Sequence, residues 1–91
     1  MNKRQVSILI SGRVQGVYFR ASSKEVALQL GITGWVRNEP DGSVFIKAEG
    51  DSKAIHQFIA WCQIGPLRAM VQHVKVEEGT PENFKSFIID R

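Results

Sequence analysis

The order of apolar patterns along the chain constrains its fold more than any other feature of the sequence. Apolar residues at every second position from 6 to 10 predict a strand that is buried largely on both faces and ends at Gly12. Residues 12–20 contain two glycines and no regular period, which predicts a loop. Apolar residues then recur at helical spacing, so we expect a helix that begins close to Arg20 and ends at Gly31.

A hairpin is predicted next. Residues 32–38 and 43–50 are both typical of strands, and the second of them places apolar side chains on one face. Between them, Pro40 presets the φ angle of a turn, and Gly42 can adopt a positive φ angle. We therefore expect these two strands to pair antiparallel.

The second half of the chain repeats the helix-then-strand order. Asp51 or Ser52 can cap a second helix, whose apolar residues follow helical spacing and which ends at Gly65. Residues 69–77 alternate in hydropathy and predict a fourth strand. The short apolar run within residues 84–90 predicts a fifth.

These elements predict an α+β fold of the ferredoxin-like β-α-β-β-α-β type. Two short helices need a common sheet to cover, and right-handed crossovers place both on one face of it. We expect one antiparallel or mixed sheet of four strands plus a short fifth. A chain of 91 residues cannot support two cores, so residues 1–91 are predicted to form a single domain.

Charge and cysteine content narrow the functional classes. The formal charge of +3 comes entirely from residues 1–46, which carry six basic and three acidic residues. Such an excess is too small to make nucleic acid the default partner, but it can attract a small anion. Cys62 has no partner for a disulfide or a metal site, and the N-terminal apolar run is too short for a signal peptide or membrane span. We therefore expect a cytoplasmic protein without a membrane partner.

The loop before the first predicted helix has the composition of an anion site. A turn containing Gly16 can point successive backbone N–H groups into one concavity, where the helix dipole adds partial positive charge. Arg20 would bring a guanidinium that donates two parallel hydrogen bonds to phosphate oxygens. Alternatively, the glycines only permit a tight connection and Arg20 pairs with a surface carboxylate.

Other polar residues have simpler interpretations. Asn38 precedes a Pro-Asp-Gly turn and, on the turn chemistry alone, is a turn residue. His56 and His73 have no partners at metal-ligand spacing, so surface or packing roles are expected. Cys62 lies on an apolar helical stripe and is predicted to be a core residue. Tyr18 could flank the acyl part of a substrate.

Two segments resemble the signature motifs of the acylphosphatase family. The first is Gly-Arg-Val-Gln-Gly-Val-Tyr-Phe-Arg at residues 12–20, and the second is Gly-Trp-Val-Arg-Asn-Glu-Pro-Asp-Gly-Ser-Val at residues 34–44. The resemblance continues through Trp61 and the Gly65-Pro66 pair to the apolar residues 87–89, so it covers almost the whole chain.

The resemblance implies hydrolysis of the carboxyl–phosphate bond of acyl phosphates, with no cofactor and no metal. It implies that Arg20 binds the phosphate and that Asn38 positions the attacking water. The phosphate cradle would be formed by the backbone amides of Gln15, Gly16, Val17, Tyr18, Phe19 and Arg20. The partners would be a small acyl phosphate and inorganic phosphate, and the protein would act as a monomer. This assignment requires Arg20 and Asn38 to lie on the same side of the molecule.

Modules of other classes share the same order of elements. RNA-binding modules stack bases on aromatic residues of the central strands, whereas the predicted third strand offers only Phe45. Copper-chaperone-like domains need two neighbouring cysteines, and only Cys62 is present. A domain that senses an anion without turnover has no distinguishing feature in the sequence and requires an assay.

Overall fold

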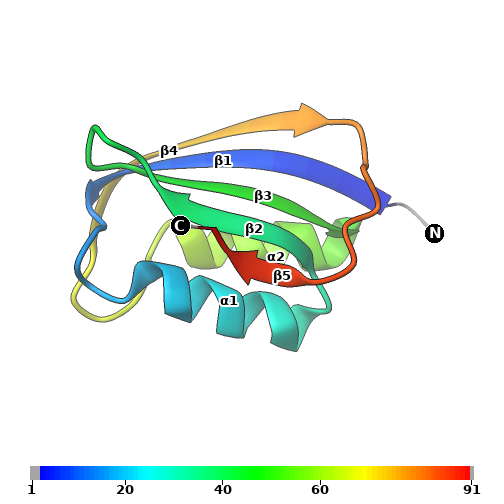
Figure 1. Cartoon of the computed structure of the whole chain (residues 1–91), viewed down its shortest axis with the longest axis horizontal. Helices are drawn as coiled ribbons and strands as arrows, with labels where there is room; N and C mark the ends of the chain where they lie inside the picture. The colour runs from blue at the N-terminus through cyan, green and yellow to red at the C-terminus, as the bar shows by residue number, and fades with distance from the viewer. Residues whose placement is uncertain (1–2, 91) are drawn as a thin grey trace.

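The structure is a computed structural model that describes residues 3–90. Its five strands form one sheet in the order β4-β1-β3-β2-β5, and Figure 1 shows both helices on one face of that sheet. The elements in chain order are β1 (Lys3–Arg13), α1 (Phe19–Leu30), β2 (Thr33–Asn38), β3 (Val44–Asp51), α2 (Ser52–Cys62), β4 (Met70–Gly79) and β5 (Phe87–Ile89).

The predicted ferredoxin-like fold is confirmed. β1 pairs antiparallel with β3 and β4, and β2 pairs antiparallel with β3 as a hairpin. β5 lies at the edge and pairs parallel with β2, so the sheet is mixed. Asp51 caps α2 by accepting a hydrogen bond from the N–H of Ala54 (2.9 Å), and Gly31 ends α1 with a φ of 71°.

β1 is longer than the sequence predicts. It does not end at Gly12 but continues to Arg13 across an irregularity in its pairing with β4 between Ser11 and Gly12. Gly12 has a φ of 126°, and a Cβ at this position would collide with the carbonyl oxygen of Met70. Glycine is therefore required here because it lets the start of β4 approach the bulged strand.

Other boundaries also differ from the prediction. α2 ends at Cys62 rather than at Gly65. Gln63 is its C-cap, and the N–H groups of Ile64 and Gly65 both donate to the carbonyl oxygen of Trp61 as the chain turns. β4 begins and ends later than predicted, and β5 comprises only residues 87–89. The prediction that β1 is buried largely on both faces is wrong. The helices cover only one face, so Leu9 on the opposite face is half-buried.

The core lies between the sheet and the two helices. Alternation in the strands turns one set of side chains toward the helices, as the period of two requires. The helices contribute Phe19, Ala27, Ala54, Ile55, Phe58 and Cys62, and the strands contribute Val6, Ile8, Ile10, Val36, Val44, Ile46, Ala48 and Phe87.

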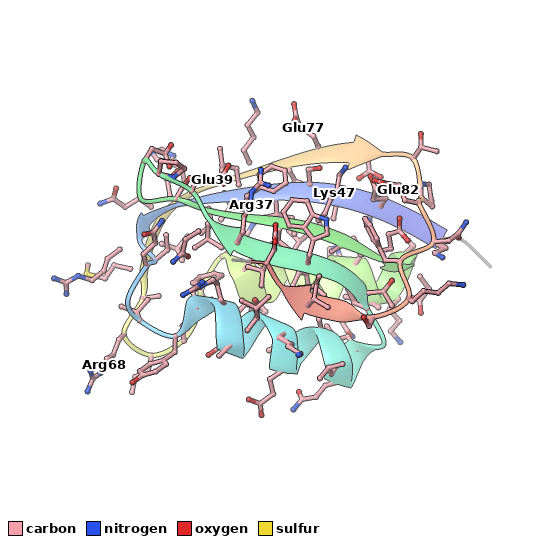
Figure 2. All side chains as sticks on the ribbon, in the orientation of Figure 1. Arg37, Glu39, Lys47, Arg68, Glu77 and Glu82 are labelled. Carbon is pink, nitrogen blue, oxygen red and sulfur yellow. The ribbon has the colours of Figure 1, made fainter. Side chains whose placement is uncertain are left out.

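The opposite face of the sheet carries an aromatic pair covered by a cation. The rings of Trp35 and Phe45 stack with their centroids 5.5 Å apart, and the guanidinium carbon of Arg37 lies 4.9 Å and 5.7 Å from the two centroids. Figure 2 shows Arg37 and Glu39 on this face, and their side chains pair at 2.9 Å. The guanidinium covers ring surface on which a nucleic-acid base would have to stack.

A buried carboxylate fixes the connection between β4 and β5. Glu49 is fully buried, and its oxygens accept hydrogen bonds from the side chain of Gln5 (2.9 Å) and from the backbone N–H groups of Glu82 and Phe84. Burial alone would raise the pKa of Glu49. The hydrogen bonds and the nearby charge of Lys3 outweigh it, so the pKa of Glu49 lies below its usual value.

Replacing Glu49 by glutamine should destabilise the fold, by about 1–2 kcal/mol at neutral pH, because one amide oxygen replaces two charged acceptors. A carboxylate with a lowered pKa stabilises the folded state above its unfolded pKa of about 4.3 and loses that contribution as the pH falls through the folded pKa. Urea unfolding should therefore show the gap between wild type and variant closing below about pH 4. An equal gap at all pH values would contradict this role.

Candidate active site

A cavity of about 340 Å³ lies where α1 begins and β2 ends. Its walls come from the β1–α1 loop, the first turn of α1, the last residue of β2 and the edge strand β5. They are formed by Val14, Gly16, Tyr18, Phe19, Arg20, Ala21, Asn38 and Ile89. Among residues 3–90, no carboxylate lines this cavity, and Arg20 brings its one charged side chain. The composition suits an anion.

The β1–α1 loop is anchored in the core, has two residues with positive φ angles and leaves the first N–H groups of α1 without a side-chain cap. Val14 and Val17 are buried and fix the loop to the core, while Gly16 and Tyr18 have positive φ values of 73° and 65°. A left-handed tyrosine costs about 1–2 kcal/mol of backbone energy. Tyr18 is the N-cap of α1 but forms no side-chain capping hydrogen bond, so the first N–H groups of the helix remain available to a ligand.

Arg20 stands in the first turn of α1 and is half-buried. None of the ion pairs within residues 3–90 involves its guanidinium. The alternative that Arg20 serves to pair with a surface carboxylate therefore finds no support in the described part of the chain. Its backbone carbonyl accepts a hydrogen bond from the Ser23 hydroxyl (2.8 Å), which fixes the main chain independently of the side chain.

Asn38 is the last residue of β2 and lies opposite Val44 in the hairpin. Strand alternation places it on the same face as Val36, toward the helices, rather than on the face of Arg37. Its Oδ1 atom is buried and has no hydrogen-bond partner within residues 3–90. A buried amide oxygen without a partner is costly in a folded protein, which indicates a site for a hydrogen-bond donor.

Gln15 acts through its side chain as well as its backbone position. Its Nε2 atom donates hydrogen bonds to the carbonyl oxygens of Glu39 (2.7 Å) and Ser43 (2.9 Å). These residues flank the β2–β3 turn, where Glu39 N–H also donates to the Ser43 carbonyl. The Gln15 side chain thus joins the loop that carries Gly16 to the strand end that carries Asn38.

Replacing Gln15 by leucine should loosen the β1–α1 loop from the hairpin and leave two carbonyl groups without this donor. We expect kcat/KM for acyl phosphates, the substrates that the family resemblance implies, to fall by about 10-fold. The free energy of unfolding should fall by about 1–2 kcal/mol. Asn at this position is too short to reach both carbonyls, so the same assay on Gln15→Asn should show a similar loss. Wild-type kinetics in both variants would show that the connection has no part in positioning.

Nothing in the sequence indicates that Ala21 and Ile89 line the cavity. Ile89 comes from β5, and it reaches the cavity because β5 pairs parallel with β2 and Ile89 stands opposite Val36. Ala21 borders the cavity because it follows Arg20 in the first turn. To place Ile89 at the cavity from the sequence, one would first have to recognise that β5 is an edge strand parallel to β2.

The remaining candidates lie outside the cavity. Cys62 is fully buried against the core, and burial raises the pKa of its thiol, so it remains protonated and packs as an apolar residue. His56 and His73 are exposed. In the described residues no three His, Cys, Asp or Glu side chains gather closely enough to hold a metal ion. Trp61 packs on Phe19 with ring centroids 5.3 Å apart.

Comparison with known proteins agrees with this geometry. The acylphosphatase family model matches residues 6–89. The chain belongs to the acylphosphatase family. It is 48% identical over 82 residues to the acylphosphatase of a Nocardioides species, covering 90% of this chain and 83% of that one. The solved acylphosphatase structure from Coxiella burnetii has a TM-score of 0.95 at 36% identity, and the match covers 98% of this chain and 94% of that one. The acylphosphatase structure from Bacillus subtilis has a TM-score of 0.94 at 35% identity, and the match covers 97% of this chain and 99% of that one.

As an acylphosphatase, this protein is a hydrolase of acyl phosphates, with inorganic phosphate as a product. Membership of an enzyme family decides against the RNA-binding and anion-sensing alternatives as the main function. No helix among the described residues is long and apolar enough to cross a membrane.

Proposed function

We propose that Arg20 and the backbone amides of residues 15–20 bind the phosphate of an acyl phosphate, and that Asn38 positions the water that attacks it. One observation carries this proposal. The side chains of Arg20 and Asn38, which come from a helix start and a strand end far apart in sequence, line the same cavity together with Gly16 and Tyr18.

The electrostatics of the cavity favour the phosphoryl group. Phosphoryl transfer passes through a loose transition state with negative charge on the equatorial oxygens, so positioning and charge supply most of the catalysis. A guanidinium can donate two hydrogen bonds to these oxygens in a fixed plane. The uncapped N-terminus of α1 adds N–H donors and the positive end of a helix dipole.

The buried Oδ1 of Asn38 suits a water molecule. This oxygen is an acceptor, so a water that donates one O–H to it turns a lone pair away from the amide. With the phosphate held by Arg20 across the cavity, that lone pair would face the phosphorus atom, on the side opposite the carboxylate leaving group. Water then forms the new P–O bond as the bond to the carboxylate breaks.

The leaving group requires no protein acid. A carboxylate is the conjugate base of an acid with a pKa of about 4, so it departs without protonation at neutral pH. The attacking water would lose its proton to a phosphate oxygen late in the step, because the described residues bring no His, Asp, Glu, Cys or Lys side chain to the cavity. Accordingly, kcat should not follow the titration of a protein group near neutral pH.

Hydrolysis of benzoyl phosphate tests the proposed function directly. We expect turnover of the purified protein and competitive inhibition by inorganic phosphate. We also expect unchanged turnover in EDTA, since no carboxylate, imidazole or thiolate from residues 3–90 lines the cavity. Inhibition by phosphate that is not competitive would place the phosphate elsewhere. Activity lost in EDTA and restored by a divalent cation would contradict the proposed metal-independent mechanism.

We also propose that residues 1–91 act as one domain and as a monomer in the cytoplasm, with no nucleic-acid or membrane partner. The family match over residues 6–89 and the small charge excess support this. Sedimentation of the protein with and without single-stranded RNA at moderate salt tests it. A dimer, or a complex with RNA that survives salt, would contradict it.

A further inference from the structure

A second cavity borders the β1–α1 loop. It measures about 440 Å³ and is lined by Arg13, Gln15, Gly16, Val17 and Arg68. Gly16 also lines the cavity of Arg20 and Asn38, so the two cavities meet at this residue. Gly16 is exposed and has no side chain, so it contributes only backbone to this boundary.

The fold brings the two arginines of this cavity together. Arg13 is the last residue of β1 and stands opposite Met70 in the ladder with β4. Arg68 precedes Met70 by two positions, in the connection between α2 and β4, and Figure 2 shows its side chain extending from that connection. The close approach of Met70 to Gly12 fixes this arrangement.

Both arginines carry uncompensated charge. Neither takes part in an ion pair within residues 3–90, although several other basic side chains there do. In the part of the chain that the structure describes, no Asp or Glu lines either cavity. The two cavities therefore adjoin at Gly16, with one cation, Arg20, lining the first and two cations lining the second.

We propose that Arg13 and Arg68 form a subsite for a second anionic group on the substrate, borne by the acyl part. The preferred substrates are then acyl phosphates whose acyl group carries a further carboxylate or phosphate, rather than uncharged acyl phosphates. This inference rests on the proposed function, since it requires the phosphoryl group to occupy the cavity of Arg20.

The exposure of Arg13 and Arg68 limits how much they can raise kcat/KM for a doubly anionic substrate. Both guanidinium groups are exposed, so their attraction for an anion is screened by water and salt. An exposed ion pair is worth up to about fivefold in affinity, so two arginines should favour a doubly anionic substrate by about 10-fold in kcat/KM. The preference should diminish as ionic strength rises.

Two substrates of matched length isolate the second anion: succinyl phosphate, which carries a distal carboxylate, and butanoyl phosphate, which lacks it. The variant is Arg13→Gln/Arg68→Gln, which removes both charges and keeps long polar side chains. We expect kcat/KM for succinyl phosphate to fall by about 10-fold and that for butanoyl phosphate by less than about twofold. The control Lys24→Gln, which removes a charge from α1 outside both cavities, should change neither.

Three results would overturn the subsite. Equal losses for both substrates would mean that the arginines only attract anions in general. An unchanged kcat/KM for succinyl phosphate in the double variant would mean that no second anion is bound. If Lys24→Gln lowered kcat/KM for succinyl phosphate relative to butanoyl phosphate as much as the double variant does, the effect would come from net charge. Continued hydrolysis of butanoyl phosphate in each case would leave the proposed function standing, whereas no hydrolysis of either substrate by the wild type would remove both.

Discussion

Replacing Arg20 by alanine is expected to lower kcat/KM for acyl phosphates by about 10³-fold, because the guanidinium supplies charge to the phosphoryl oxygens in the transition state. Inhibition by inorganic phosphate should also disappear, since the same group binds the ground-state dianion. The fold should persist, with a change of less than about 1 kcal/mol in the free energy of unfolding. Arg20 forms no ion pair in the described chain, and its backbone carbonyl keeps the hydrogen bond from Ser23.

The control for this variant is Lys24→Ala. Lys24 lies one turn later on α1, so its loss removes the same charge from the same helix without altering the cavity. Steady-state kinetics with benzoyl phosphate and a phosphate inhibition series measure both variants. If Arg20→Ala were to retain the wild-type inhibition constant for phosphate, the guanidinium would not be the phosphate ligand.

Replacing Asn38 by alanine should separate binding from turnover. Loss of the amide leaves the phosphate ligands intact, so the inhibition constant for inorganic phosphate should change by less than about threefold, while kcat falls by about 10²- to 10³-fold. Removing the side chain also removes a buried, unpartnered oxygen, so the fold should not lose stability through this atom. The folded variant should therefore bind phosphate but turn over slowly.

Arg37→Ala controls for disturbance of the hairpin. Arg37 precedes Asn38 on β2 but lies on the opposite face, over Trp35, so its removal should leave kcat within about twofold. An Asn38→Ala variant with wild-type kcat would show that the asparagine is only a turn residue. A parallel loss of kcat in Arg37→Ala would instead attribute the effect to the strand end as a whole.

Much of the fold was predictable because its signals are local. The alternation in residues 6–10, the left-handed Gly31 and the turn at residues 39–42 each specify an element through the residues beside it. The burial of Glu49 was not predictable in this way. Its partners Gln5, Glu82 and Phe84 come from the two ends of the chain and meet it only after the sheet has formed. The parallel edge position of β5 depends on the same long-range packing.

The candidate site was predictable to a similar degree. Glycine and arginine at the entry to a helix indicate an anion loop from local chemistry alone. Asn38, by contrast, has the sequence environment of a turn residue, and only the family resemblance suggested another role. The direction of the Gln15 side chain, toward Glu39 and Ser43, depends on the approach of the loop to the hairpin, which no spacing reveals. The left-handed conformation of Tyr18 is equally a product of the folded loop.

The central claim is that a water held by Asn38 attacks the phosphorus atom held by Arg20. Hydrolysis of benzoyl phosphate by the enzyme in ¹⁸O-labelled water, with mass spectrometry of both products and correction for the uncatalysed reaction, tests it most directly. We expect the label to enter inorganic phosphate and the benzoate to remain unlabelled. Label in the benzoate carboxylate would mean attack on the carbonyl carbon and would contradict it.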